Sequence, residues 1–292
     1  MSSADVAARR DELPAWPAWL RLARISNTPT VVSNTIAGAA LASAAAHTGT
    51  VVLIAVAMAL FYTAGMVLND VLDEDVDRRE RPERPLPSGQ VSRRAAVAAV
   101  VALFAAGAAL LALEGLAALL AGLGLIALIV LYDAWHNDNP LSPVLMAGCR
   151  ALVYVVAGLA VAASLSAELW GGAALLLVYV VGLTQVAKAE GGGIVARWPV
   201  LALLAPAAYW AKELPSPEVA LLLVAFVAWA GWALWLVIAR HRVGPAVGRL
   251  IAGIALYDAL AVAGGGGGAG AVAACLAAFA ATIALQTKIA GT

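Results

Sequence analysis

The sequence is poor in charged residues, in cysteine and in histidine. Only 12% of its 292 residues are charged, about half the fraction of an ordinary soluble domain, which argues against a water-soluble fold. The two cysteines, Cys149 and Cys275, lie in apolar runs and lack the spacing of a zinc or thioredoxin motif. The three histidines fall between apolar runs, so they do not suit a bound haem. There is no basic tract with interleaved aromatic residues, and nucleic acid is therefore not an expected partner.

Long apolar runs are what the sequence has in abundance. Hydrophobic residues make up 63% of the chain, and runs close to the length that crosses about 30 Å of hydrocarbon recur throughout. The pattern predicts an all-α fold, a polytopic membrane bundle of nine or ten transmembrane helices. We expect one transmembrane domain at 29–292, preceded by an N-terminal segment at 1–28. The predicted spans are 29–46, 51–69, 95–113, 115–132, 143–163, 168–187, 198–211, 218–239, 246–263 and 270–288.

Charged residues are confined to alternate connections between these spans. The N-terminal segment and the connections 70–94, 133–142, 188–197 and 240–249 hold nearly all Lys and Arg outside the spans, whereas the intervening connections hold one cation, Lys212. The positive-inside rule places the charged connections in the cytoplasm. The N-terminal segment is polar and lacks the short apolar core of a cleavable signal peptide. We therefore expect a multi-pass protein of the cell (inner) membrane with a cytoplasmic N-terminus.

An acidic cluster follows the second predicted span at 69–77. Asp70, Asp73 and Asp77 are spaced by three and four residues, so they share one face if the helix continues. Like charges on one face repel each other, and Mg²⁺, which prefers carboxylate, water and phosphate oxygens, would relieve that repulsion. The alternative is a solvated loop whose acids and arginines simply pair with each other. That alternative explains the arginines but not the one-sided spacing of the acids.

A basic run comes directly after the acidic cluster. Arg78, Arg79, Arg81 and Arg84 precede the loop 85–89, in which proline and glycine favour a turn into the third span. Guanidinium groups bind phosphate oxygens through paired hydrogen bonds. An acidic cluster and arginines at a membrane surface together predict a site for a metal ion and a diphosphate.

The combined pattern resembles the first aspartate-rich motif of the UbiA superfamily of intramembrane prenyltransferases. It reads Asn69-Asp70-x-x-Asp73-x-x-x-Asp77 and continues Arg81-x-x-Arg84-Pro-Leu-Pro-Ser-Gly. The segment Arg21-Leu-Ala-Arg24, with Asn27, is similar to the opening segment of that family. The resemblance implies a nine-helix bundle with a cytoplasmic polar cap over a lipid-facing cavity. It also implies a polyprenyl diphosphate donor and Mg²⁺.

The resemblance also assigns roles to individual residues. By carry-over, Asp70, Asp73 and Asp77 are catalytic and bind Mg²⁺, with Asn69 supporting them. Arg81 and Arg84 bind the phosphates. The further substrate-binding residues that we predict are Arg24, Asn27, Asp133 and Arg150.

The second aspartate-rich motif expected of this family is degenerate here. The connection at 184–193 retains one carboxylate, Glu190, beside Lys188. A second Mg²⁺ would lack ligands there, and Lys188 can replace its charge as a direct phosphate contact. We include both residues in the predicted catalytic set. The same degeneracy fits a protein that binds a diphosphate lipid without ionising it.

The fourth connection, 132–143, is polar and lies on the same predicted face. Its continuation, Met146-Ala-Gly-Cys-Arg-Ala-Leu152, looks like the EboC-like branch of the superfamily, which implies a setting in metabolite export. Asp133 and Asp138 can supply the carboxylates that the second motif lacks. A hydrated turn, with Asn139 and Pro140 ending one helix, is the alternative.

Two ionisable residues fall inside predicted spans. Arg150 lies about 10 Å below the membrane surface at 1.5 Å per residue, and Asp258 is near the middle of its span. Charges at such depth face the protein interior and are paired. Arg150 is a candidate for binding phosphate or acceptor from below the site, and Asp258 fits a hydrogen-bonded structural role.

Three functions compete for this pattern. The first is a prenyltransferase that transfers a prenyl group to an unidentified small-molecule or lipid acceptor. The second is a non-catalytic binder or carrier of a prenyl lipid in a metabolite export system. The third, a CDP-alcohol phosphotransferase, requires Gly and Ala where this chain has Glu74 and Asp77, and we reject it.

Overall fold

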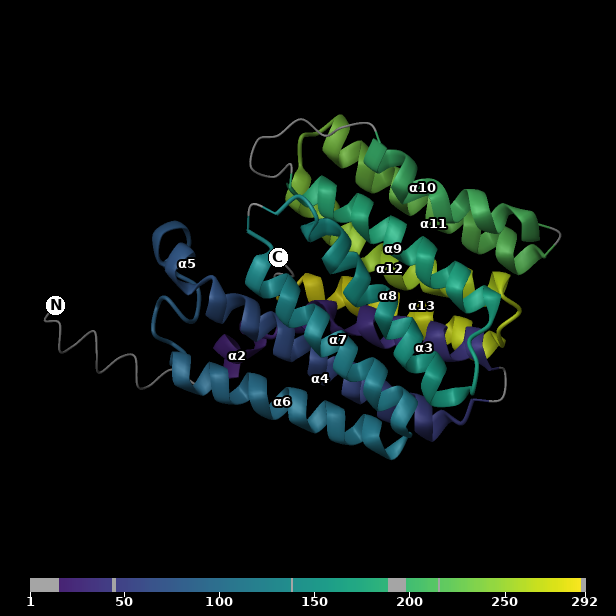
Figure 1. Ribbon diagram of the computed structural model, residues 1–292. Coiled ribbons are helices and arrows are strands. Elements are labelled where there is room, and N and C mark those ends of the chain that lie inside the picture. Colours follow the sequence, from purple (N-terminus) through teal and green to yellow (C-terminus); the bar gives the residue numbers. More distant parts are fainter. Residues whose placement is uncertain (1–15, 44–45, 138, 189–197, 215, 290–292) are drawn as a thin grey trace, which may run out of the picture.

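The computed structural model describes residues 16–43, 46–137, 139–188, 198–214 and 216–289, and within them it is entirely helical (Figure 1). Twelve α-helices and two short 3-10 helices form, with no strand among the described residues. The helices are α2 (Trp16–Leu22), η1 (Ile25–Asn27), α3 (Thr28–Ala42), α4 (Thr48–Leu72), α5 (Glu74–Glu80), α6 (Arg93–Leu113), α7 (Leu116–Trp135), α8 (Ser142–Val161), α9 (Ala167–Lys188), α10 (Trp198–Trp210), η3 (Ala211–Glu213), α11 (Pro217–Ile238), α12 (Val243–Gly264) and α13 (Ala269–Gln286).

Each predicted span corresponds to one helix among α3, α4 and α6–α13, so the predicted all-α membrane bundle is confirmed. Within the described part of the chain, eight helices are long and apolar enough to cross a membrane: α4, α6, α7, α8, α9, α11, α12 and α13. The other two, α3 with 15 residues and α10 with 13, are shorter. The chain is a multi-pass membrane protein.

Local sequence signals set several helix ends. Ser92 and Ser216 precede α6 and α11, and their hydroxyls accept hydrogen bonds from the backbone N–H groups of Ala95 (3.2 Å) and Val219 (3.4 Å). These bonds satisfy amides that lack a partner in the first helical turn. Gly115, at φ +116°, permits the sharp reversal between α6 and α7. The connection there is only two residues long, so these helices are antiparallel neighbours.

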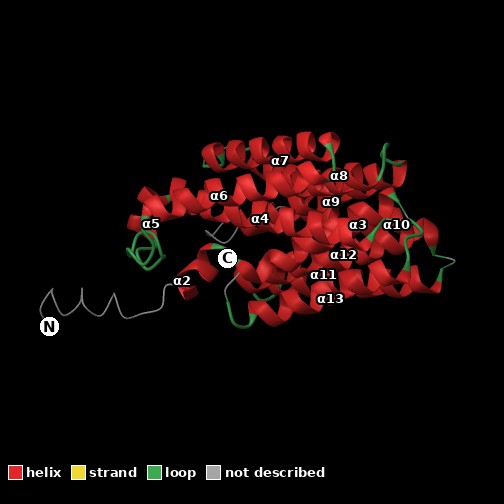
Figure 2. Cartoon of the chain, turned by 90° about the horizontal axis from the view of Figure 1, so that it is seen from below, coloured by secondary structure: helices red, strands yellow, loops and turns green. Residues whose placement is uncertain are grey.

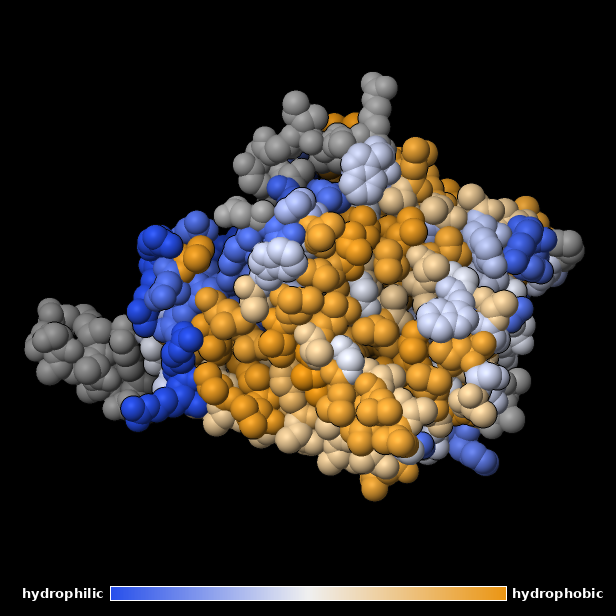
Figure 3. Space-filling model, in the orientation of Figure 1, coloured by the Kyte–Doolittle hydropathy of each residue, from blue (hydrophilic) through white to orange (hydrophobic). Residues whose placement is uncertain are grey.

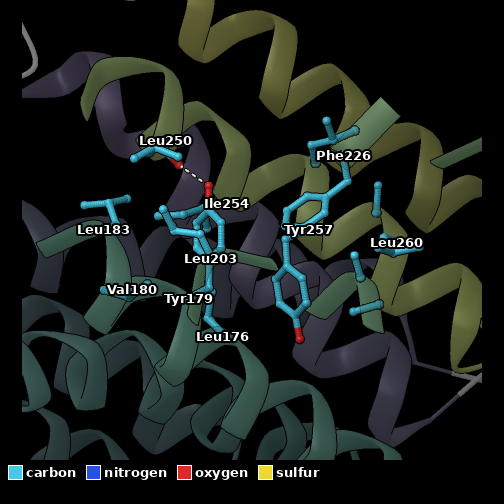
Figure 4. Packing of buried hydrophobic residues seen from close by; sticks show 14 of the residues in the cluster. Leu176, Tyr179, Val180, Leu183, Leu203, Phe226, Leu250, Ile254, Tyr257 and Leu260 are labelled. Carbon is cyan, nitrogen blue, oxygen red and sulfur yellow. Dashed lines mark hydrogen bonds between the residues drawn. The ribbon is translucent and has the colours of Figure 1, made fainter. Parts of the chain in front are cut away.

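The bundle packs around α3 and α12. Helix α3 contacts α4, α8, α12 and α13, and it approaches α8 so closely that a Cβ on Gly38 would lie 2.7 Å from the backbone of Tyr154. Small residues allow such close approach between membrane helices. Around α12, the aromatic rings of Tyr179, Phe226 and Tyr257 pack together, and the Tyr179 hydroxyl donates to the Leu250 carbonyl at 2.8 Å (Figure 4).

The surface separates into an apolar face and a polar end. Apolar side chains cover the face in Figure 3, whereas hydrophilic residues gather at the end that carries α5. That end projects past the bundle, with α2 beside it (Figure 2). Exposed apolar residues lie along α6 and α7, including Val101, Leu113, Leu116 and Leu120. A face of this kind suits lipid as its solvent.

Candidate functional site

A cavity of about 820 Å³ opens between the helices at the polar end. Its deeper walls are apolar and come from α3, α4, α7, α8, α9 and α12. Its charged lining residues are Arg21, Arg24, Asp70, Arg81, Glu83, Arg84, Asp133 and Arg150. Apolar walls below a ring of charge suit a lipid with an ionic headgroup.

Asp70 lies at this mouth and is flanked by two arginines. Its Oδ1 is 3.2 Å from Arg24 Nη2 and 3.6 Å from Arg84 Nη1. The carboxylate is buried, so the two cations provide the charge balance that burial demands. Arg24 has φ 43° and ψ 47°, a left-handed conformation that is costly for a residue other than glycine. Such strain is common where a side chain is held against a ligand.

The acidic motif is not one continuing helix, and that prediction is wrong at Asp73. Helix α4 ends at Leu72 and α5 begins at Glu74. The carboxylate of Asp73 turns to the α7–α8 connection, where it accepts a hydrogen bond from Asn137 Nδ2 (3.0 Å) and lies 3.3 Å from His136 Nε2. Burial raises the pKa of Asp73, but the hydrogen bonds from His136 and Asn137 outweigh it, and the pKa is lowered. The same contact raises the pKa of His136.

Asp77 has a different partner from Asp73. Its Oδ2 accepts a hydrogen bond from Arg84 Nη1 at 2.7 Å. Among the described residues, no three acidic, histidine or cysteine side chains converge to hold a metal ion by themselves. The three aspartates therefore do not form one ligand cluster in this structure. Asp75, by contrast, points outward with a side chain that is 92% exposed.

Glu74 is buried, although it was not among the predicted site residues. Its carboxylate lies 2.7 Å from Arg93 Nη1 and 2.6 Å from Arg78 Nη2. Arg93 also donates to the carbonyl of Val71 at 2.8 Å. The hydrogen bond from Arg93 lowers the pKa of Glu74 despite burial, and the charges of both arginines add to the effect. These contacts fasten α5 to the start of α6.

Asp133 on α7 provides another carboxylate of the cavity. Asn69 Nδ2 donates to its Oδ1 at 3.4 Å. Its Oδ2 is buried and, within the described part of the chain, finds no hydrogen-bond partner. A buried carboxylate oxygen without a partner is costly. Asp133 also lines the cavity, so a cation or donor from a ligand would satisfy this atom.

These residues fit a bound Mg²⁺. Asp70 and Asp133 both line the cavity, and Asn69, which precedes Asp70, donates to Asp133. Mg²⁺ in proteins is commonly held by one or two carboxylates, with water and substrate phosphate completing its shell. A set of three carboxylates is therefore not required.

Arg150 occupies the cavity below the mouth, as predicted from its depth. Its Nη1 donates to Thr30 Oγ1 (3.0 Å) and Asn34 Oδ1 (3.1 Å), and its guanidinium lies 5.5 Å from the ring centre of Tyr62.

Arg81 reaches the cavity from the loop after α5, and Asn27 lines it from η1. Arg21 and Glu83 also line the cavity and were not among the predicted site residues, although Arg21 belongs to the segment that resembles the family's opening segment.

The predicted second aspartate-rich motif, at 184–193, is only partly described by the structure. Lys188 donates to Ser142 Oγ at 2.9 Å. The residues of α9 that line the cavity are Val180, Leu183, Thr184 and Ala187. The predictions for Glu190 and Asp138 lie outside the described residues.

The helices and the cavity together define an integral membrane protein whose spans enclose an apolar cavity with a charged mouth. The chain belongs to the UbiA prenyltransferase family, whose family model matches residues 31–290. The resemblance inferred from the aspartate-rich motif is thereby confirmed. Membership of the EboC-like branch stays a prediction.

Individual proteins similar to this chain are consistent with membership of this family. The chain is 39% identical over 79 residues to a digeranylgeranylglyceryl phosphate synthase from Methanopyrus kandleri, a match covering 27% of this chain and 29% of that relative. A solved structure described as giving insights into digeranylgeranylglyceryl phosphate synthase in membranes has TM-score 0.64 and 16% identity, covering 87% of this chain and 99% of its own. A UbiA homolog from Archaeoglobus fulgidus bound to DMAPP and Mg²⁺ has TM-score 0.54 and 18% identity, covering 93% and 100%. At these identities the structures establish a shared fold.

Proposed function

We propose that this chain is an intramembrane prenyltransferase that transfers a prenyl group from a prenyl diphosphate to an acceptor. The observation that carries the proposal is Asp133 Oδ2, a buried oxygen without a partner among the described residues, in the cavity that Asp70 shares. Two arginines beside Asp70 supply cationic charge for a diphosphate. Apolar walls beneath them suit a prenyl tail.

Asp70 and Asp133 would hold Mg²⁺, with Asn69 fixing the orientation of Asp133. The support is their fit to the ion and the solved relative bound to DMAPP and Mg²⁺. When bound, the ion neutralises negative charge on the diphosphate as it leaves. The predicted ligand roles of Asp73 and Asp77 stay predictions, because neither residue is among the described residues that line the cavity.

The protein's own side chains support the chemistry in two ways. Arg24 and Arg84 are already in place where negative charge grows as the bond between the allylic carbon and the diphosphate oxygen breaks. The electron pair leaves with the diphosphate. The apolar walls, among them Phe61 and Leu125, exclude water from the allylic cation until the acceptor forms the new bond and gives up one proton.

The acceptor proposed here is a lipid that carries a glyceryl phosphate group. The name of the Methanopyrus relative indicates a product with two geranylgeranyl groups on glyceryl phosphate, although the match covers only 29% of that protein. Five arginines line the cavity, namely Arg21, Arg24, Arg81, Arg84 and Arg150. That is more cationic charge than one diphosphate beside Mg²⁺ requires, so a second phosphate group fits the site.

The orientation of the site follows from the charge distribution. We place the mouth of the cavity on the cytoplasmic side of the cell (inner) membrane, because the connections with most cations lie at this end. A cysteine introduced for Asp75 would react with an impermeant thiol reagent in inside-out vesicles and not in intact cells. The opposite pattern would reverse the orientation.

The experiment for the function measures turnover and binding together. The purified chain is given geranylgeranyl diphosphate, Mg²⁺ and geranylgeranylglyceryl phosphate, and pyrophosphate release and the lipid product are measured. Asp70→Asn and Asp133→Asn should lower turnover by about a hundredfold or more. Asp75→Asn, in the same motif but outside the cavity, is the matched control and should leave turnover unchanged.

A non-catalytic prenyl-lipid binder is the second candidate. It is favoured by Lys188, which is bonded to Ser142 and is not among the described residues that line the cavity. In this case geranylgeranyl diphosphate with Mg²⁺ would raise the thermal midpoint of the protein and be recovered intact. Recovery of intact diphosphate after long incubation with acceptor would contradict the prenyltransferase and support the binder.

A further inference from the structure

A buried carboxylate lies beneath the cavity and is not explained by the proposed chemistry. Asp258 is in the middle of α12 and is 0% exposed. Three side chains donate to it: Ser33 from α3, Asn34 from α3 at 2.9 and 3.0 Å, and Tyr154 from α8 at 2.6 Å. Donors that converge on both oxygens satisfy the hydrogen-bonding capacity of this fully buried carboxyl group.

The nearest arginine on the cavity wall is linked to this carboxylate by a single amide. Asn34 Nδ2 donates to Asp258, while Asn34 Oδ1 accepts from Arg150 Nη1 at 3.1 Å. Because the NH₂ group of the amide is committed to the carboxylate, its oxygen must face the guanidinium. Asp258 therefore determines that the amide oxygen of Asn34, and not its NH₂ group, faces Arg150.

We infer that Asp258 is a positioning residue for Arg150 and acts through the amide of Asn34. The inference rests on the proposed function, in which Arg150 binds a phosphate group of a lipid substrate. Arg150 shares the cavity with Asp70 and Asp133. An arginine without its own support would be drawn toward those carboxylates and would compete with the metal ion. Its hydrogen bonds to Asn34 and Thr30 hold it lower in the cavity.

Asp258 also has a packing role that has to be separated from positioning. Its bonds to Ser33 and Tyr154 join α12 to α3 and α8. The Tyr154 bond touches the same carboxylate but does not lead to Arg150. Tyr154→Phe is therefore a matched control, because it weakens the packing contact and leaves the link through Asn34 intact.

The main test is a double-mutant cycle between positions 258 and 150. Asp258→Asn should raise the KM for geranylgeranyl diphosphate or for geranylgeranylglyceryl phosphate by about tenfold. Arg150→Gln should raise the same KM. If Asp258 acts through Arg150, adding Asp258→Asn to Arg150→Gln should cause no further rise in KM. Tyr154→Phe should lower the thermal midpoint while KM stays within about twofold of wild type.

A rescue variant makes the test sharper. The exchange Asn34→Asp with Asp258→Asn moves the carboxylate next to Arg150 and keeps the number of charges and donors. It should return KM close to the wild-type value. If Asp258→Asn does not fold, Asn34→Leu breaks the same link while Ser33 and Tyr154 still bond Asp258, and it should give the same rise in KM.

Several outcomes would overturn the inference. They are additive effects in the cycle, no rise in KM in the Asp258 and Asn34 variants, or an equal rise from Tyr154→Phe. If the wild-type chain shows no turnover, the proposed prenyl transfer fails on its own. The same cycle is then measured as the rise in thermal midpoint caused by geranylgeranyl diphosphate with Mg²⁺, and additivity there would refute the positioning role separately.

Discussion

Arg84 donates to Asp77 across 2.7 Å, and the same nitrogen is 3.6 Å from Asp70. Asp77 thus holds Arg84 at the mouth of the cavity without reaching the cavity itself. This is a different role from the metal ligand that the motif suggested, and the two roles can be separated by measurement.

Asp77→Asn should raise the KM for geranylgeranyl diphosphate by about tenfold and change kcat less, because Arg84 loses its anchor while Asp70 and Asp133 remain. Steady-state kinetics at saturating Mg²⁺ would show this. Asp75→Asn, two residues away and exposed, is the control. A loss of kcat in Asp77→Asn that high Mg²⁺ restores would instead identify Asp77 as a ligand.

Glu74 should stabilise the polar end in a pH-dependent way. The pKa of Glu74 is lowered from its usual 4.5 by the hydrogen bond from Arg93 and by the nearby charges. A carboxyl group whose pKa falls on folding contributes stability above its unfolded pKa and loses that contribution as the pH falls through the folded value. Wild type should therefore lose stability relative to Glu74→Gln below about pH 4.5.

The size of this effect is modest because both arginine partners are more than half exposed. Glu74→Gln should cost about 1 kcal/mol near neutral pH, measured as a fall in thermal midpoint in detergent. Glu80→Gln, an exposed acid at the end of the same helix, should cost nothing measurable. An equal fall in both variants would show that the α5 charge matters rather than the Glu74 pairing.

The sequence predicted the spans well because a run of about 20 apolar residues has few alternatives to a membrane helix. It also placed Arg150 in the cavity, since a charge at that depth has to face the protein interior. The break at Asp73 could not be read from local spacing. Asp73 at this break is hydrogen-bonded to Asn137, which lies 64 residues away in the chain. The burial of Glu74 likewise depends on Arg93 at the start of another helix.

The contact between Asn137 and Asp73 should order the α7–α8 connection beside the end of α4. Asn137→Asp replaces a donor by a carboxylate and sets two negative charges against each other. Amide hydrogen exchange should then rise in the α7–α8 connection near Asp133 and stay unchanged in α11. Asn137→Ser, which keeps a donor, should exchange more slowly than Asn137→Asp. Equal exchange in the two variants would show that the contact does not order this connection.

The depth of the cavity should select prenyl chain length, and Gly65 offers a direct test. Gly65 and Ile129 line the cavity from α4 and α7, and a Cβ at position 65 would lie 2.9 Å from Ile129 Cγ2. Gly65 precedes Asp70 by five residues, or about 7.5 Å of helix. A dimethylallyl group held at Asp70 ends near this level, whereas a geranylgeranyl group has to pass it.

Gly65→Val should therefore lower kcat/KM for geranylgeranyl diphosphate about tenfold more than for dimethylallyl diphosphate, since added methyl groups obstruct only the longer chain. The matched control is Gly124→Val on α7, where a Cβ meets nothing within 4 Å. It makes the same residue change on an open surface and should leave the ratio of the two donors unchanged. Equal losses for both donors in Gly65→Val would mean that the prenyl tail takes another path, because an obstruction below the short group cannot affect that group through contact.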